Sequence, residues 1–90
     1  MLKITTTTSF KKDYKRAIKQ NKNIKKLDDV LWHLANFLPL DKRFRDHKLS
    51  GNYDEKRECH VEPDWLLIYE IVEDELILYR VGTHSELFGK

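Results

Sequence analysis

The spacing of apolar residues differs between the two halves of the chain. In the first half they recur every three or four positions, the period of a helix with one buried face. Two helices are expected, with apolar stripes at Phe10, Tyr14, Ala17 and Ile18 and at Ile24, Leu27, Leu31, Leu34 and Leu38. We expect Thr8 or Ser9 to cap the first helix and residues 21–23 to separate the two. Pro39 should end the second, because proline lacks the backbone donor that a helix needs.

The strands are predicted mainly in the second half. Residues 2–6 alternate and include β-branched side chains, which predicts a short opening strand. Residues 39–52 are rich in turn formers and charges and are expected to form a long loop. Three strands are expected at residues 53–61, 65–72 and 76–81, followed by a tail with room for one helical turn. The nearly continuous apolar run at 65–72 is typical of a central strand buried on both faces.

This order of elements predicts an α+β fold. Two N-terminal helices are expected to pack on a mostly antiparallel four-stranded sheet, in one domain covering residues 1–90. The composition, 40% apolar and 36% charged, is that of a soluble globular protein. No apolar run approaches the ~18–20 residues of a membrane span, and the opening lacks the apolar core of a signal peptide. A single cysteine, Cys59, cannot form an internal disulfide, so we expect a cytoplasmic protein without a membrane partner.

The charge of the chain is unevenly distributed although its net value is only +2. Residues 1–48 carry 13 Lys and Arg against 5 Asp and Glu, whereas residues 49–90 carry 4 against 10. A basic half of this kind suits a polyanion such as a nucleic acid, because phosphate contacts release condensed counterions. It is equally compatible with a lysine-rich helical face that only meets solvent.

Three histidines of the second half stand at the ends of predicted elements. His47 lies in the loop, His60 before the turn at Glu62-Pro63, and His84 after the last strand. A zinc site is disfavoured, because Cys59 and His60 are adjacent and point to opposite faces of a strand, so we expect no metal and no cofactor. Metal-free RNA cleavage needs a proton donor, a proton acceptor and positive charge at the phosphate, and histidines with an arginine meet that need.

Further residues could complete such a site. Arg80 could hold the phosphate through its planar fork, and Asp64 could fix the tautomer of a histidine. Trp65 and Phe88 could stack on a base, and Glu58 shares a strand face with His60. Each has a plainer interpretation as a core, capping or solvated residue.

Three ordered motifs resemble one known family. They are Phe44 to Gly51 (FRDHKLSG), His60 to Tyr69 (HVEPDWLLIY) and Arg80 to Gly89 (RVGTHSELFG). Together they resemble the YafQ branch of the RelE toxin superfamily over most of residues 38–90. The resemblance implies a fold like that of microbial ribonucleases and cleavage of mRNA, often on the ribosome. It also implies a cognate antitoxin, expected here as an acidic segment, that turns a free monomer into a hetero-oligomer.

The resemblance also implies the site residues. These are His47, His60, Asp64, Arg80, His84 and Phe88, with Glu58, Trp65 and Lys48 as secondary candidates for substrate binding. His84 is the first choice for proton transfer. Two alternatives stay open: a gyrase-inhibiting toxin of the related ParE group, which needs no proton-transfer groups, and a non-catalytic domain that binds nucleic acid through its basic helices.

Overall fold

The computed structural model describes residues 1–50 and 55–89 of the chain. Its elements, in chain order, are β1 (Lys3–Thr6), α1 (Thr8–Lys19), α2 (Ile24–Ala35), the 3-10 helix η1 (Lys42–Phe44), β2 (His47–Lys48), β3 (Arg57–Glu62), β4 (Trp65–Val72), β5 (Glu75–Gly82) and α3 (His84–Phe88). The predicted α+β order is confirmed. No helix within these two ranges is both long and apolar enough to cross a bilayer.

The described strands form one sheet in the order β1-β5-β4-β3-β2. β1 runs parallel to β5, and every other pair is antiparallel. The four-strand prediction was wrong by one, because His47 and Lys48 pair with Glu58 and Arg57 inside the segment expected to be a loop. β3 begins at Arg57, and residues 53–54 of the strand expected at 53–61 lie outside the described residues.

Both long helices differ from the prediction at one end. The side chain of Thr7 accepts a hydrogen bond from Phe10 N at 3.0 Å, so Thr7 caps α1 in place of Thr8 or Ser9. α2 ends at Ala35, well before Pro39, because Phe37 takes a left-handed conformation with φ of 58° that a helix cannot contain. The last residue of each predicted stripe is exposed: Ile18 within α1, and Leu38 beyond the end of α2.

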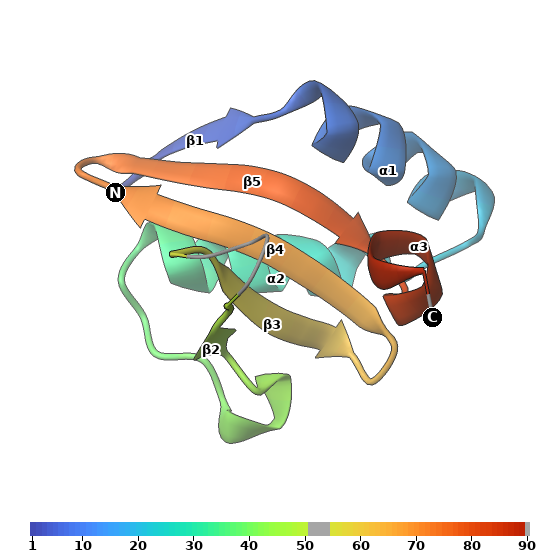
Figure 1. The fold of residues 1–90 in the computed structure, drawn as a ribbon. Coiled ribbons are helices and arrows are strands. Elements are labelled where there is room, and N and C mark those ends of the chain that lie inside the picture. Colours follow the sequence, from blue (N-terminus) through green and yellow to red (C-terminus); the bar gives the residue numbers. More distant parts are fainter. Residues whose placement is uncertain (51–54, 90) are drawn as a thin grey trace.

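The core lies between the helices and one face of the sheet (Figure 1). Alternate residues of β4 point to opposite faces, so Trp65, Leu67 and Tyr69 join the helical core, whereas Leu66 and Ile68 form a smaller cluster on the other face. All five side chains are buried, which confirms the predicted central strand. We call this second side of the sheet, which carries α3 but neither α1 nor α2, the open face.

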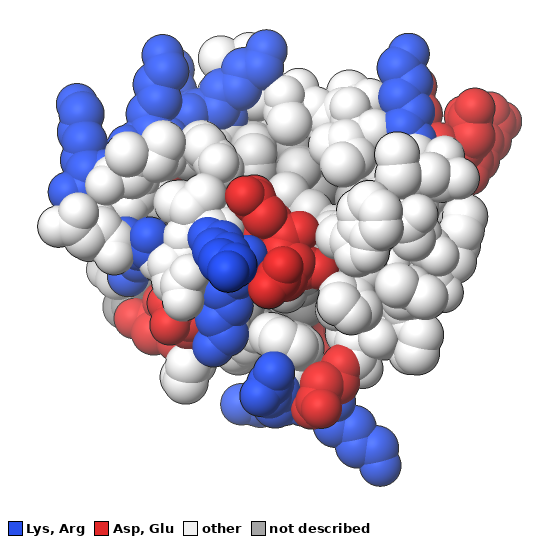
Figure 2. All heavy atoms as spheres, turned by 180° about the vertical axis from the view of Figure 1, so that it is seen from behind, with Lys and Arg blue, Asp and Glu red and all other residues white. Residues whose placement is uncertain are grey.

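Seen from the helical side, several Lys and Arg side chains stand at the upper left, Asp and Glu side chains lie near the centre and at the upper right, and an uncharged area occupies the right-hand side (Figure 2). Three exposed apolar side chains, Trp32, Phe37 and Leu38, belong to the end of α2 and the segment after it.

Candidate active site

The register of the sheet gathers the predicted polar residues on the open face. His47, Glu58, Ile68 and Arg80 are aligned across β2, β3, β4 and β5, and His60, Leu66 and Gly82 form the next row. Neighbouring strands lie about 4.8 Å apart, so residues distant in sequence become neighbours within each row. Leu66 and Ile68 supply an apolar floor between the charged groups.

His84 is held by Asp64 across the open end of the sheet. Its ring Nδ1–H donates to Asp64 Oδ1 at 2.5 Å, and its backbone N–H donates to the same oxygen at 2.9 Å. These two hydrogen bonds, the backbone one foremost, lower the pKa of Asp64 below its ordinary value. The contact brings the turn at residues 60–65 next to residues 80–84. It leaves Nε2 as the ring nitrogen that can exchange a proton with a substrate.

The short helix α3 fixes the position of His84. Thr83 and Glu86 form a capping box at its start, with Thr83 N–H donating to Glu86 Oε1 at 2.8 Å. This backbone hydrogen bond is the main cause of the lowered pKa of Glu86. Arg16 Nε lies 3.1 Å from Glu86 Oε2, so the helix is also tied to α1. His84 thus stands on a segment that is braced from two sides.

Glu58 stands between two further histidines. Its Oε2 lies 3.0 Å from His47 Nε2 and 3.9 Å from His60 Nε2. The other ring nitrogen of His47 donates to the carbonyl of Arg45 at 2.7 Å. The ring centroids follow one another, 6.2 Å from His47 to His60 and 5.7 Å from His60 to His84. The three predicted histidines therefore form one row, with His60 nearly buried in the middle.

Arg80 is aligned with Ile68 on the neighbouring strand and is paired with a residue that the sequence analysis missed. Its Nε and Nη2 donate to the two carboxylate oxygens of Asp13 on α1, at 2.6 and 3.1 Å. Asp13 is buried and also accepts from Val81 N at 3.1 Å and Arg16 Nη2 at 3.0 Å. The position of Asp13 between Phe10 and Ala17, on the buried stripe of α1, was the signal that could have revealed it.

Of the remaining predicted residues, one lies on the same side as the histidine row and two point away from it. Phe88 lies one helical turn after His84, on the same face of α3, and is partly exposed. Lys48 is exposed but follows His47 in β2, so its side chain points to the opposite face of the strand. Trp65 is only 1% exposed and packs in the helical core, so the expectation that it stacks on a base was wrong.

The nearby cysteine and tyrosine are not reactive groups. Burial raises the pKa of the Cys59 thiol far above its ordinary value, so the thiolate that nucleophiles and metal ligands require is disfavoured. Burial and the hydrogen bond to Asp46 likewise raise the pKa of Tyr69, whose hydroxyl donates to Asp46 Oδ1 at 2.6 Å. Within residues 1–50 and 55–89, no group of three or more His, Cys, Asp or Glu side chains is placed to hold a metal ion.

Solved structures of two bacterial toxins share this architecture. A copper-bound mutant toxin from Helicobacter pylori superimposes with a TM-score of 0.93 at 43% identity, covering 98% of this chain and 100% of that one. YafQ from Escherichia coli, solved in its complex with DinJ, gives a TM-score of 0.90 at 40% identity, covering 99% and 100%. Both likenesses extend over the whole described fold.

Sequence comparisons agree with the structures. The mRNA interferase toxin YafQ of Escherichia coli K12 is 43% identical over 81 residues, which cover 89% of this chain and 88% of that protein. The family profile described as "Bacterial toxin of type II toxin-antitoxin system, YafQ" matches residues 2–89. The chain therefore belongs to the YafQ family of toxins of bacterial type II toxin–antitoxin systems.

Proposed function

We propose that this toxin is an endoribonuclease that cleaves mRNA by attack of a ribose 2′-OH on the neighbouring phosphate, without a metal ion. The observation that carries the proposal is the row of three histidines on the open face, whose exposed end, His84, is oriented by Asp64. The Escherichia coli relative, named an mRNA interferase, supports the same activity. Such a toxin acts where mRNA is found, in the cytoplasm.

His84 is the proton-transfer group that best meets the geometric needs of the reaction. Its ring is about half exposed, and Asp64 holds Nδ1, so Nε2 can face a phosphate. Asp64, although exposed, also favours the imidazolium that forms when His84 takes up a proton, because its carboxylate accepts from the same ring. His60, 5.7 Å away between ring centroids, supplies a second group for the opposite proton transfer.

The other residues of the site orient a histidine, stabilise negative charge on the phosphate or contact a base. Glu58 orients His47 through a contact of 3.0 Å, and His47 is also held by the Arg45 carbonyl. Arg80, directed by Asp13, provides a guanidinium at the edge of the row for the negative charge that develops on the phosphate. Phe88, on the face of α3 that carries His84, offers a ring for a splayed base.

Copper is bound by the Helicobacter pylori mutant, yet the described side chains of this chain offer no group of three ligands for it. Cys59 is buried, and the Nε2 atoms of His47 and His60 both face the Glu58 carboxylate. The proposed reaction therefore uses side chains alone. The 2′-OH loses its proton and its oxygen forms a bond to phosphorus, the P–O5′ bond breaks, and O5′ receives a proton, which leaves a 2′,3′-cyclic phosphate on one fragment and a 5′-hydroxyl on the other.

The test is cleavage of labelled RNA by the purified protein in EDTA. Replacing His84 by Ala should lower the rate by ~10²–10⁴-fold, the usual loss for one acid–base group. Asp28→Ala is the control, because Asp28 is exposed on α2 and lies outside the row and its neighbouring grooves. A substrate with one 2′-deoxyribose at the cut site should stay intact. Cleavage that required added metal, or that survived loss of all three histidines of the row, would overturn the proposal.

The alternatives are not favoured. Neither a gyrase-directed toxin nor a non-catalytic binding module accounts for the family and the named relative together. The partner is a cognate antitoxin, since the Escherichia coli relative is solved with DinJ. We propose that its contacting segment is acidic, because α1 carries four lysines and one arginine against the single carboxylate of Asp13.

A further inference from the structure

A groove adjoins the histidine row on the side of α2 and η1. Its volume is about 360 Å³, within the range of small-ligand sites. It is lined by Lys26, Arg43, Phe44, Arg45, His60, Val61, Glu62 and Pro63. The groove thus begins at a residue of the proposed site and leads away from it over a different part of the fold.

The groove carries an excess of positive charge. Lys26 comes from α2, and Arg43 and Arg45 come from η1 and its C-cap, whereas Glu62 is the single carboxylate of the lining. Among residues 1–50 and 55–89, none of these three cations forms an ion pair, in contrast to Arg16, Arg57 and Arg80. Unpaired cations around a groove favour an anionic ligand.

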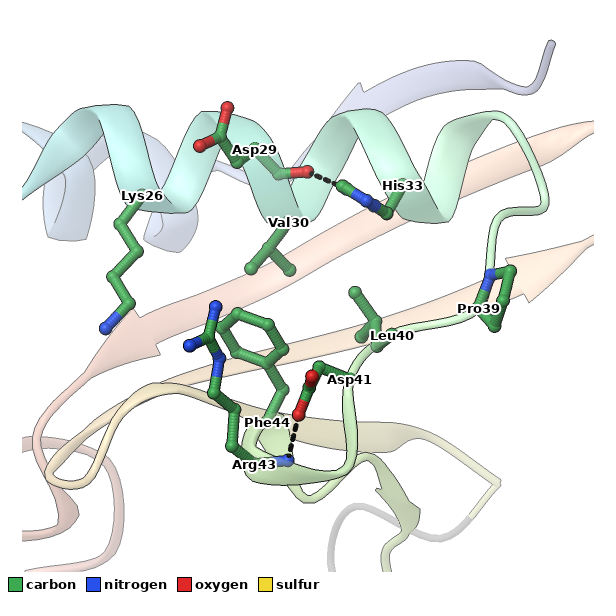
Figure 3. A pocket seen from close by; sticks show the side chains of 9 residues that line it. All are labelled: Lys26, Asp29, Val30, His33, Pro39, Leu40, Asp41, Arg43 and Phe44. Atoms are coloured by element: carbon green, nitrogen blue, oxygen red, sulfur yellow. Dashed lines mark hydrogen bonds between the residues drawn. The ribbon is translucent and has the colours of Figure 1, made fainter.

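An aromatic ring lies among these cations. Phe44 is half-buried, and the guanidinium of Arg43 lies 5.1 Å from its ring centroid. Figure 3 shows Arg43 rising beside the Phe44 ring while Lys26 extends toward them from α2. A flat ring beside cations is the arrangement that binds single-stranded nucleic acid, where the base stacks and the phosphates meet Lys or Arg.

The groove is joined to the reaction centre by two contacts. His60 belongs both to its lining and to the histidine row. Arg45, another lining residue, accepts through its carbonyl the hydrogen bond that holds His47. A nucleotide in the groove would therefore be the immediate neighbour of a phosphate held at the row.

We propose, on the basis of the function proposed above, that this groove is a subsite for the nucleotide on one side of the scissile phosphate. Phe44 stacks on its base, and Lys26, Arg43 and Arg45 contact its phosphates. A second hollow of about 450 Å³ shares Lys26, Arg43 and Phe44 with the groove and extends between α2 and the segment around Leu40 (Figure 3). This second hollow can accommodate the next nucleotide of the RNA strand.

The first experiment measures binding of a short RNA whose 2′ positions are methylated, so that it cannot be cleaved. Fluorescence anisotropy gives Kd for the wild type, Arg43→Ala and the control Lys42→Ala, which removes the same charge from η1 outside the groove. We expect Arg43→Ala to raise Kd and to reduce the slope of log K against log salt by ~0.7, the value of one phosphate contact on a single strand. Lys42→Ala should change neither quantity.

The second experiment tests the stacking by pairing a protein variant with an RNA variant. An abasic nucleotide on one side of the cut site should weaken binding to the wild type by about 5- to 150-fold, the value of one stacked base. Phe44→Leu, whose folding is checked by thermal melting, should lose most of that penalty, whereas the abasic position on the other side should be equally costly for both proteins.

Two results would overturn the subsite. One is a Kd for RNA that rises equally in Arg43→Ala and Lys42→Ala, or that rises in neither variant; the groove would then be left for protein contacts. The other is an abasic penalty that is the same for wild type and Phe44→Leu. Because these readings are binding constants on uncleavable RNA, they are separate from the cleavage test: a wild type that cleaves RNA but fails here retains its function without this subsite.

Discussion

Asp13 provides the most direct test of how the helices hold the site. Its side chain is 3% exposed and accepts hydrogen bonds from Arg80 Nε, Arg80 Nη2, Arg16 Nη2 and Val81 N, at 2.6, 3.1, 3.0 and 3.1 Å. Asp13→Ala removes all four acceptor contacts at once. It leaves the buried N–H of Val81 without this acceptor and removes the Asp13 carboxylate from both guanidinium groups, of which Arg16 keeps its contact with Glu86.

The cost of this change follows from the exposure of each partner. A buried backbone N–H left without an acceptor costs about 1–3 kcal/mol. The paired contact with Arg80, whose side chain is 26% exposed, contributes about 1.5–3 kcal/mol at most. Arg16 is 39% exposed, so its contact is worth only about 0.2–1 kcal/mol. Together these give about 3–7 kcal/mol, a large part of the ~5–13 kcal/mol expected for 90 residues.

The assay is thermal and urea unfolding of the purified toxin. A loss of about 3 kcal/mol should lower Tm by at least ~12 °C in a domain of this size. Asp13→Asn, which keeps an acceptor for Val81 but not the charge, should lose roughly half as much and serves where the alanine variant does not fold. Asp28→Ala, an exposed position on α2, should change stability by less than about 0.5 kcal/mol. A loss under about 1 kcal/mol in Asp13→Ala would refute the reasoning.

Three further outcomes are expected. Because folding lowers the pKa of Asp64, the wild type should be more stable than Asp64→Asn above the ordinary pKa of 3.8. This difference in stability should vanish as the pH falls through the lowered pKa of Asp64. Urea midpoints that differ by the same amount, or not at all, from pH 3 to 7 would contradict this prediction. Tyr69→Phe removes the hydroxyl that donates to Asp46 at 2.6 Å and should lower the free energy of urea unfolding by about 1–2 kcal/mol. An unchanged free energy would show that this hydrogen bond does not stabilise the fold. Gly82→Ala places a methyl group 3.0 Å from Glu86 Oε1, so it should lower the free energy of unfolding by about 1–3 kcal/mol, measured by thermal melting. An unchanged Tm would show that α3 moves aside without cost.

The periodicity of the sequence predicted the layers of the fold but not the ends of its elements. Helix and strand patterns depend on which face is buried, and that information is local. The end of α2 depends on the left-handed backbone of Phe37, a residue type that gives no sign of it. β2 was missed because two residues carry no pattern of their own, and they become a strand only by pairing with β3.

The site was predictable as a set of residue types and not as an arrangement. The motifs selected His47, His60 and His84, but the register that aligns them depends on strand pairing between distant segments. The carboxylate that holds Arg80 comes from α1, outside all three motifs. An acidic residue on an otherwise apolar helical stripe is the local sign of such a buried ion pair, and it can be read without a structure.

The parallel pairing of β1 with β5 joins almost the first residues of the chain to almost the last. Thr7 Oγ1 donates to the Tyr79 carbonyl, a contact across 72 positions, and His84 follows only five residues later. During synthesis, β1 therefore has no partner until β5 has left the ribosome, and the histidine row is still missing one member. The site therefore assembles only after residues 75–84 have been made, and a fragment that stops before β5 leaves β1 unpaired and lacks His84.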